Sequence, residues 1–353
     1  MNAGYGAISN RWFRDYFDIR IAASITATGR MINKWNIHHV NKQLNDQLET
    51  DNFDYAFYGD TDSNYITMKN LVDQKGWTDL PTDDIVHNLD EWYKENLDPT
   101  IDEYAQDMCD LMNGYEQKMV WSREVIAQSA VWQAPKLYIM AVNNSEGVAY
   151  ATPKVKIMGV AARKSSFPQW CRDRMAACYK TVLLGTEEEL QDQVKQIGMD
   201  YMNLSVEEIA GASSVSNIHK YTNDVGMPIK GAPYNSKASI LYNNACDKKG
   251  LHDEERINEG DKMVMAKLIE GNPLQYGYIA FPTFLPPELG LHDWIDYKGT
   301  YEKMFLHPMD LILEPRGWES KKRVKLFDSK PKGHAQGKKV APKNVEVKTR
   351  KLF

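Results

Sequence analysis

The stretch Asp54–Met68, which reads DYAFYGDTDSNYITM, decides the fold of the chain around it. Its two ends, 54–58 and 63–68, are rich in aromatic and β-branched residues, which favour extended strands. Between them stands Gly59–Asp62, and glycine and aspartate are typical of turns. The pattern predicts a β-hairpin with a four-residue turn.

Helical patterns precede and follow this hairpin. Residues 21–49 carry apolar side chains at helical spacing, which predicts one long amphipathic helix. Residues 83–112 form an acidic helical stretch, and residues 169–209 are helical again. Within this last range, Thr186 and Ser205 each precede a glutamate by three positions, which is the spacing of a capping box at the start of a helix.

Two further segments, 136–142 and 148–159, have the composition of strands and flank a turn-like sequence. After residue 210 the pattern is one of loops and short strands. We therefore predict an α+β fold, with an α+β unit that extends to about residue 165. A mainly helical unit is expected from about 168 to 315.

The composition is typical of a folded chain with an unusual end. Of the 353 residues 42% are hydrophobic, and the four cysteines form no CxxC pair. Because no apolar run could cross a bilayer and no signal peptide is recognisable, we expect a cytoplasmic protein without a membrane partner. The net charge is −5, but residues 316–353 contain 13 Lys and Arg against 3 Asp and Glu. Such a basic tail is usually solvated, and it is also suited to binding phosphate.

The hairpin turn contains the residues with the clearest chemistry. Side chains two positions apart in an extended chain point the same way, so Asp60 and Asp62 are expected to face one site. Two neighbouring carboxylates repel each other unless a cation lies between them, and Mg²⁺ prefers oxygen ligands. A carboxylate-held metal pair can support an in-line phosphoryl transfer. The alternative is that Gly-Asp-Thr-Asp is only a good turn sequence.

Six consecutive residues, Tyr58–Ser63 (YGDTDS), resemble the catalytic motif C of family B DNA polymerases. Further segments resemble other parts of that family in the expected order. They are Asn2–Gly6 (the end of motif B), Lys136–Tyr138 (the K-x-Y motif), Lys154–Gly159 (the basic strand after it), and Ser213–Tyr221 with Pro228–Asn243 (thumb segments of the T-even-type phage replicative polymerases). In that phage group the pair Arg123-Glu124 also has a palm counterpart. The resemblance extends to about residue 327.

The resemblance implies a fold and a domain organisation. The end of the fingers would occupy 1–20, the palm 21–167, the thumb 168–315 and a basic tail 316–353. The palm of this family is an antiparallel sheet with helices on one face, and the YGDTDS hairpin would lie at its centre. The thumb would be mainly helical and would grip duplex DNA.

The resemblance also implies the role of individual residues in DNA-directed DNA synthesis. Asp62 would bridge two Mg²⁺ ions and Asp60 would be a supporting carboxylate, so both would be catalytic and metal-binding. The other implied contacts are with the incoming dNTP (Asn2, Tyr5, Gly6), with the primer end of the primer-template DNA (Lys136, Tyr138, Lys154, Lys156) and with the duplex backbone (Lys220, Tyr221, Lys230, Lys237). Glu124 would be an additional palm carboxylate. For each lysine alone, a solvated surface position is the alternative.

Several parts of the family pattern are not found in this sequence. We find no motif A (D-x-x-S-L-Y-P), whose aspartate completes the metal site, and no motif B lysine, amino-terminal domain or proofreading exonuclease. The resemblance therefore implies a carboxy-terminal portion that needs a partner chain, the N-terminal polymerase half, and we expect the chain alone to be inactive. A naturally split phage enzyme and a truncated reading frame both remain open.

The basic tail offers a second function. Polymerases of this phage type end in a peptide whose apolar-aromatic pair inserts into the sliding clamp. Two pairs here resemble it: Leu326-Phe327 in the sequence context, and Leu352-Phe353 in the terminal position. The alternative to an enzyme is thus a non-catalytic DNA- and clamp-binding fragment of a broken gene. The presence of both Asp60 and Asp62 favours the enzyme.

Overall fold

The computed structural model describes residues 2–251 and 256–321. Within this part the chain divides into two compact units. The first contains 2–130 and 140–156, and the second contains the remaining described residues. The domain boundaries expected after residues 20, 167 and 315 remain predictions. Both Leu-Phe pairs of the tail, at 326–327 and 352–353, lie outside the described residues.

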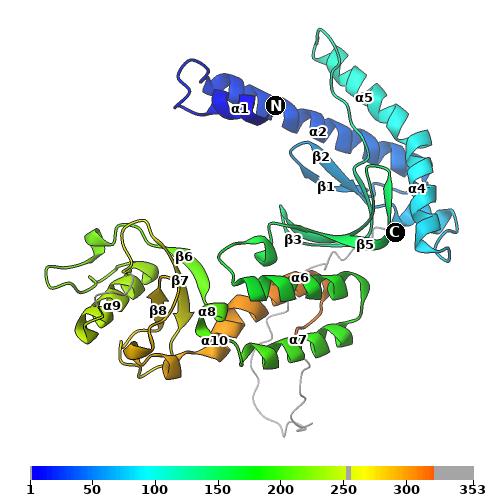
Figure 1. The fold of residues 1–353 in the computed structure, drawn as a ribbon. Helices are drawn as coiled ribbons and strands as arrows, with labels where there is room; N and C mark the ends of the chain where they lie inside the picture. The colour runs from blue at the N-terminus through cyan, green and yellow to red at the C-terminus, as the bar shows by residue number, and fades with distance from the viewer. Residues whose placement is uncertain (1, 252–255, 322–353) are drawn as a thin grey trace, which may run out of the picture. The chain divides into compact units, whose positions relative to one another are not determined.

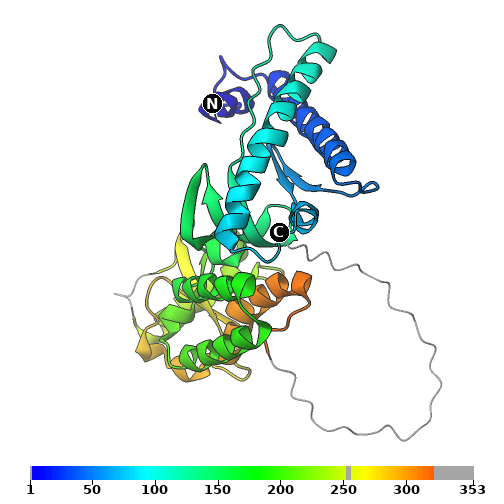
Figure 2. The ribbon, with the colours of Figure 1, turned by 90° about the vertical axis from the view of Figure 1, so that its right-hand side faces the viewer.

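The first unit is built on one long helix and a hairpin (Figure 1). Its elements are α1 (Asn2–Ser9), α2 (Ile19–Gln47), β1 (Ala56–Asp60), β2 (Ser63–Ile66), α3 (Lys69–Gln74), α4 (Thr82–Asn96) and α5 (Asp98–Leu111). The helix expected over 21–49 is confirmed as α2, whose start is capped by Asp18 through the backbone N–H of Arg20 (2.9 Å). Helices α2 and α5 pack side by side (Figure 1, Figure 2).

The hairpin differs from its prediction in the length of its loop. Its loop has two residues, Thr61 and Asp62, because Gly59 and Asp60 pair with Asn64 and Ser63 and so belong to the strand. In the described chain β1 and β2 form a two-stranded sheet of their own, because the chain after β2 continues directly into helices α3 to α5. The expected place of the hairpin at the centre of a palm sheet remains a prediction.

The acidic stretch expected as one helical segment is two helices. Helix α4 ends at Asn96, Leu97 stands between, and α5 begins at Asp98 with Pro99 in its first turn. Proline has no N–H to donate and is tolerated at the start of a helix but not inside one. The break therefore follows from Pro99.

A second sheet consists of β3 (Val125–Ala134), β4 (Leu137–Ser145) and β5 (Val148–Met158), in that order. Strands β4 and β5 confirm the two predicted segments, whereas β3 was not predicted. Glu146 and Gly147 both have positive φ (50° and 85°), the pattern of the tight turn that suits the twist of a hairpin. Each of these three strands has some residues in the first unit and the others in the second.

The core of the first unit joins α2 to the hairpin and to the helices after it. Val40 and Leu44 of α2 are buried with Tyr55 and Ala56 at the start of β1. The same cluster continues through α3, α4 and α5 as Leu71, Val72, Ile85, Val86, Leu89, Leu97 and Ile101. The strand that leads to the turn is thus anchored by the long helix.

The second unit contains a helical part and a small antiparallel sheet. Its helices are α6 (Gln169–Leu184), α7 (Glu187–Tyr201), α8 (Val206–Ile209), α9 (Tyr234–Lys249), α10 (Tyr297–Tyr301) and α11 (His307–Leu313), with a π-helical turn η5 (Glu302–Leu306). Its strands β6 (Gly211–Ser214), β7 (Lys262–Lys267) and β8 (Tyr278–Phe281) form one sheet in that order. Short 3₁₀ turns are Ala161–Arg163, His219–Tyr221, Pro287–Leu289, His292–Trp294 and Glu314–Arg316.

Sequence patterns anticipated α6 to α8 but missed α9. Both capping boxes are confirmed: Thr186 with Glu189 begins α7, and Ser205 with Glu208 begins α8. Helix α9 buries small, polar and aromatic residues on several sides, so it has no apolar stripe at helical spacing.

The cysteines of the second unit are packed in its core. Cys171 and Cys178 are fully buried on α6, and burial raises the pKa of both thiols to about 12. They are therefore protonated, unreactive thiols, as expected for residues two helical turns apart on one face. No helix among the described residues combines the length and the apolar character that crossing a membrane requires.

The capping box at Thr186 gives a stability prediction. Replacing Thr186 with Ala removes the acceptor of the Glu189 backbone N–H and should lower the free energy of unfolding by about 1 kcal/mol. Urea unfolding followed by circular dichroism measures it. Thr186→Ser keeps the hydroxyl and should retain most of the stability; equal stability of the Ala variant would contradict the role of the cap.

Candidate active site

The loop of the β1–β2 hairpin is a tight, strained turn. The carbonyl of Asp60 accepts a hydrogen bond from the backbone N–H of Asp62 at 2.7 Å, across Thr61 alone. Thr61 has a φ of 57°, in the left-handed region that β-branched residues avoid. This is a γ-turn of the rare form with positive φ. Strain of this kind persists only where neighbouring contacts hold it.

Helix α2 supplies such a contact from behind the turn. The side-chain amide of Asn33 donates a hydrogen bond to the carbonyl oxygen of Thr61 at 3.3 Å, and Asn33 is 7% exposed. In the described part of the chain, the Oδ1 atoms of Asn33 and Asn64 are buried and without a hydrogen-bond donor. Because unsatisfied buried acceptors are costly, these two oxygens are suited to an ordered water beside the turn.

Gly59 is needed because α2 lies so close to the strand. A Cβ added at Gly59 would lie 3.0 Å from Cδ1 of Ile37, 3.1 Å from Oδ1 of Asn64 and 3.2 Å from Nδ2 of Asn33. These separations are shorter than ordinary van der Waals contacts. The glycine of YGDTDS therefore allows the helix and the turn to approach each other.

The two aspartates of the turn have different surroundings. Asp60 is half-buried at the end of β1, and its Oδ1 accepts a hydrogen bond from the hydroxyl of Thr61 at 3.1 Å. Asp62 is exposed in the loop. In the described ranges, no group of three or more His, Cys, Asp or Glu could hold a metal ion. The turn thus carries two carboxylates, and among the described residues no third ligand of these types joins them.

The residues expected to contact the incoming nucleotide lie in α1. Tyr5 is 40% exposed, and Gly6 has open space around its Cα, with its carbonyl bonded to the hydroxyl of Ser9 (3.2 Å). Asn2 is the first residue of this helix. The role of Asn2, Tyr5 and Gly6 at the incoming nucleotide remains a prediction.

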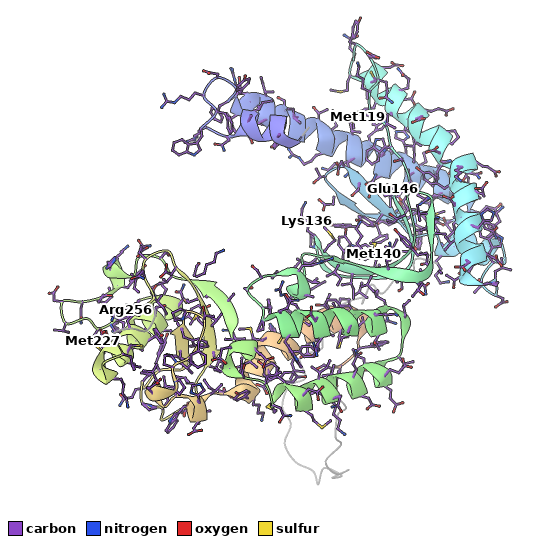
Figure 3. All side chains as sticks on the ribbon, viewed as in Figure 1. Met119, Lys136, Met140, Glu146, Met227 and Arg256 are labelled. Carbon is purple, nitrogen blue, oxygen red and sulfur yellow. The ribbon has the colours of Figure 1, made fainter. Side chains whose placement is uncertain are left out.

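Lys136 occupies the turn between β3 and β4 (Figure 3). It is exposed and has a φ of 64°, which is unusual for a residue with a side chain. A Cβ on Gly159 would lie 2.4 Å from the Lys136 carbonyl oxygen, so Gly159 permits this backbone approach. Tyr138 is buried with its ring 5.5 Å from that of Trp132. Tyr138 is thus a packed residue of strand β4, and its contact with the primer end remains a prediction.

The other basic residues expected near the primer lie on β5. Lys154 is exposed and its Nζ lies 3.8 Å from the centroid of the Tyr150 ring, while Lys156 is half-buried. A ring face under an ammonium group restricts where that group can lie. Contact of either lysine with DNA remains a prediction.

The residues expected to grip duplex DNA surround the start of α9 in the second unit. Lys220 and Lys230 are exposed, and Tyr221 and Lys237 are half-buried. The loop between Tyr221 and Lys230 is closed by an antiparallel bridge from Thr222 to Pro228. The sequence predicted that these residues belong to one region, but it did not predict helix α9, which holds the loop between them.

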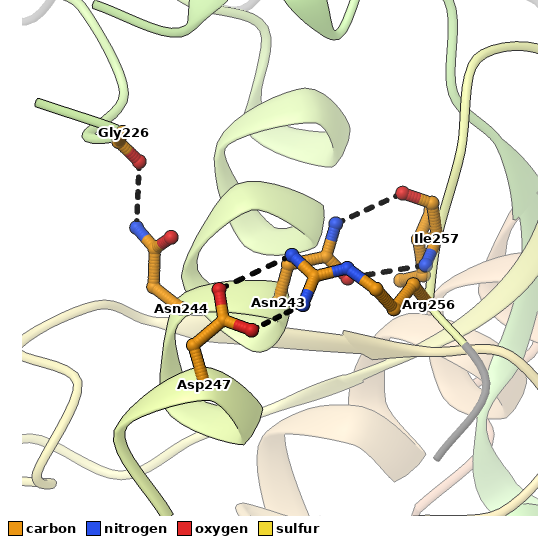
Figure 4. A network of polar contacts seen from close by, with 6 residues as sticks. All are labelled: Gly226, Asn243, Asn244, Asp247, Arg256 and Ile257. Carbon is orange, nitrogen blue, oxygen red and sulfur yellow. Dashed lines mark hydrogen bonds and ion pairs between the residues drawn. The ribbon is translucent and has the colours of Figure 1, made fainter. Parts of the chain in front are cut away.

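Helix α9 fastens this region through a polar network (Figure 4). The amide of Asn244 donates to the carbonyl of Gly226 at 2.7 Å. Asn243 bonds to Ile257 in both directions, at 2.9 and 3.1 Å, and Asp247 forms a two-pronged ion pair with Arg256. The network holds two loops to one helix and so fixes the backbone that carries Lys230.

Glu124 is not part of a metal cluster in the described chain. Its side chain is exposed, and its backbone carbonyl accepts a hydrogen bond from Glu146 (2.7 Å). Its neighbour Arg123 instead forms a largely buried ion pair with Asp90 at 2.6 Å. Burial alone would raise the pKa of Asp90, but the hydrogen bond from Lys94 and the charge of Arg123 outweigh it, so the pKa lies below its usual value.

Two residues of this site were missed in the sequence: Asn33, which supports the turn, and Thr61, which adopts its strained conformation. Asn33 and Asn36 are polar, yet they share one face of α2 with the buried Val40 and Leu44. A polar residue within an apolar stripe is the signal that would have pointed to Asn33. Nothing in the sequence indicates the positive φ of Thr61.

The structure thus shows a strained hairpin turn with two carboxylates and, elsewhere, basic residues on strand β5. Over 343 residues the chain is 35% identical to the DNA-directed DNA polymerase of Escherichia phage RB69, in a match that covers 93% of this chain and 37% of that polymerase. It is 30% identical over 339 residues to the DNA-directed DNA polymerase of Enterobacteria phage T4, in a match that covers 92% of this chain and 37% of the relative.

These similarities confirm the expected resemblance to phage DNA polymerases. The chain spans a little over a third of the length of these two relatives. No family model matches it.

The close approach at Gly59 gives a testable pair of substitutions. Gly59→Ala forces the turn away from α2 and should lower the free energy of unfolding by about 1 to 3 kcal/mol, as overpacking does. Gly29→Ala, in open space on the same helix, should stabilise the protein by up to about 1 kcal/mol. Urea unfolding compares them, and a Gly59→Ala variant as stable as Gly29→Ala would refute the steric account.

The ion pair of Arg123 with Asp90 gives a pH prediction. Because the pKa of Asp90 is lowered from 3.8, the stability that it contributes is present above pH 3.8 and is lost as pH falls through the lowered value. Because Lys94 still pairs with Asp90, Arg123→Gln should cost about 1.5 kcal/mol at pH 7, and the difference from the unmodified chain should shrink below pH 3.8.

Unfolding curves at several pH values test the ion pair. Lys118→Gln is the matched control because it breaks an exposed pair with Glu116, and it should change stability by less than about 0.5 kcal/mol. A cost of Arg123→Gln that stays constant from pH 7 to below 3.8 would show that the charge of Asp90 is not involved.

Proposed function

We propose that this chain is the carboxy-terminal, palm-and-thumb portion of a family B DNA-directed DNA polymerase, which extends a primer on a template. The observation that carries the proposal is the similarity to a phage DNA polymerase over 93% of the chain. The turn itself supports it further. The hydrogen bond that closes the turn joins two backbone atoms. The turn could therefore form without the carboxylates of Asp60 and Asp62.

The ligands that the turn offers are of the type that Mg²⁺ prefers, but they are too few to hold the metal. Asp60 and Asp62 offer carboxylate oxygens, which this hard cation prefers. Because the described residues contain no group of three such ligands, we infer that a further carboxylate comes from a partner chain with motif A. When bound, two Mg²⁺ ions would activate the primer hydroxyl and neutralise charge on the dNTP phosphates.

The residues of this chain would hold and align the reactants. Asp62 and Asp60 would hold the metal ions. Lys136, Lys154 and Lys156 would bind phosphates of the primer, while Tyr5 and Gly6 would lie against the new base pair. The thumb lysines would bind the duplex backbone without sequence preference, and this binding would weaken as salt rises.

Two protein partners belong to the proposal. The N-terminal polymerase half would supply motif A, the fingers and the exonuclease. A sliding clamp would bind one of the Leu-Phe pairs of the tail. The proposed setting is the cytoplasm of the phage-infected host cell.

Substitution at the turn tests the proposal. Primer extension is measured with this chain and a separately expressed amino-terminal half from the same genome. Asp62→Asn should lower the rate by about three orders of magnitude, the loss expected when several kcal/mol of metal-based stabilisation disappear. Asp79→Asn, an exposed carboxylate in the same unit, should leave the rate unchanged.

Three outcomes would change the proposal. Normal extension by the Asp62→Asn variant would exclude the turn as the metal site. Efficient extension by this chain alone would exclude the need for a partner. DNA binding without extension, with both halves present, would favour a non-catalytic DNA- and clamp-binding fragment.

A further inference from the structure

Thr61 connects helix α2 to both aspartates of the turn. Its carbonyl oxygen accepts a hydrogen bond from the side-chain amide of Asn33 at 3.3 Å, and its hydroxyl donates one to Oδ1 of Asp60 at 3.1 Å. The backbone N–H of the next residue, Asp62, closes the turn on the Asp60 carbonyl at 2.7 Å. Asn33 is therefore one residue away from the carboxylate of Asp60 and from the backbone of Asp62.

A second carboxamide, that of Asn64 on β2, lies on the same side of the hairpin as that of Asn33. The Nδ2 atom of Asn33 and the Oδ1 atom of Asn64 lie 3.2 and 3.1 Å from the point that a Cβ of Gly59 would occupy. The two side chains thus face one backbone position, one from the helix and the other from the neighbouring strand.

The two carboxamides are costly as packing residues. Asn33 is 7% exposed, and in the described part of the chain the Oδ1 atoms of both side chains are buried without a hydrogen-bond donor. An ordered water can satisfy such oxygens, but leucine side chains of similar shape would need none. Leucines would also suit the apolar neighbour Ile37, whose Cδ1 borders the same position. Packing alone therefore gives no reason for two asparagines here.

We propose that Asn33 and Asn64 are positioning residues for the metal-binding turn. The amide of Asn33 holds the Thr61 carbonyl, and the Thr61 hydroxyl then fixes one oxygen of Asp60, so the carboxylate is oriented in advance of metal binding. Asn64 gives the Asn33 side chain a polar neighbour, so one ordered water can serve both oxygens. Ligands that are held in place in advance lose less freedom on binding, which strengthens the binding of a metal ion.

This inference rests on the proposed function and adds two residues that the resemblance to polymerases did not assign. Neither asparagine belongs to the YGDTDS string, and neither is proposed to touch the metal ions or the nucleotide. Their effect is on the Mg²⁺ concentration that synthesis needs, and not on the rate once Mg²⁺ is saturating.

Hydrogen exchange tests the hold on the turn without any synthesis. The full chain is studied in EDTA, exchange at residues 58–65 is followed by mass spectrometry, and urea unfolding is measured in parallel. In the double variant Asn33→Leu/Asn64→Leu, Thr61 loses the amide donor, so exchange at the turn should be about fivefold faster, as the loss of one hydrogen bond allows. The urea midpoint should stay the same or rise, because two costly buried oxygens are removed.

A magnesium titration tests the effect on synthesis. Primer extension is measured with this chain and the separately expressed amino-terminal half. The double variant should need about fivefold more Mg²⁺ for its half-maximal rate, and its rate at saturating Mg²⁺ should stay within about twofold of normal. A residue that served only packing would not separate these two quantities.

Two further variants serve as the control and as a test of the second step. Asn36→Leu makes the same change on the same helix at a side chain that is 2% exposed and, among the described residues, forms no hydrogen bond with the turn. It should leave exchange at the turn and the Mg²⁺ requirement unchanged. Thr61→Val keeps the branched shape but removes the hydroxyl, so it should raise the Mg²⁺ requirement while exchange at the turn stays normal.

Two results would overturn the proposal. If the double variant changes neither the exchange nor the Mg²⁺ requirement, the two asparagines have no part in holding the turn. If its urea midpoint falls and exchange rises throughout the unit, they only stabilise the fold. Failure of extension with every chain, including the unmodified one, would instead count against the proposed function, and exchange in EDTA would still decide whether the asparagines hold the turn.

Discussion

The close packing of helix α2 against the β1–β2 hairpin is the contact on which the candidate active site depends. At Gly59 the helix and the strand approach so closely that even a methyl group would meet three side chains. From the same helix, Asn33 reaches the carbonyl of the strained Thr61. The geometry of the two aspartates is therefore set by a helix that carries neither of them. A turn held in this way is preorganised, which is what a metal site requires.

The strain at Thr61 and the packing beneath it belong together. A threonine with positive φ costs free energy, and the buried contacts of Val40, Leu44, Tyr55 and Ala56 offset this cost. The close approach of α2 to β1 explains why glycine, which usually weakens a strand, is used at position 59.

Tyrosine rings lie beneath three of the six lysines that we propose to contact DNA. Lys154 lies over Tyr150, Lys220 over Tyr221 and Lys237 over Tyr276. A lysine otherwise loses much side-chain freedom when it binds a phosphate. A ring that already restricts the ammonium group reduces this cost while leaving the charge available. The pairing with tyrosine therefore distinguishes these lysines from ordinary surface lysines in a way that their sequence positions do not.

The sequence by itself determined much of the local structure and indicated the two candidate metal-binding aspartates. Helix α2, the strands of the hairpin and both capping boxes follow from patterns within a few residues, because local backbone preferences act over that range. The YGDTDS string likewise revealed the likeness to phage polymerases. Only the tertiary structure decided that the hairpin stands as its own two-stranded sheet, that Thr61 is strained, and that Asn33 supports it. The same holds for helix α9. These features arise from contacts between residues far apart in the chain, and no local pattern encodes which of them will meet.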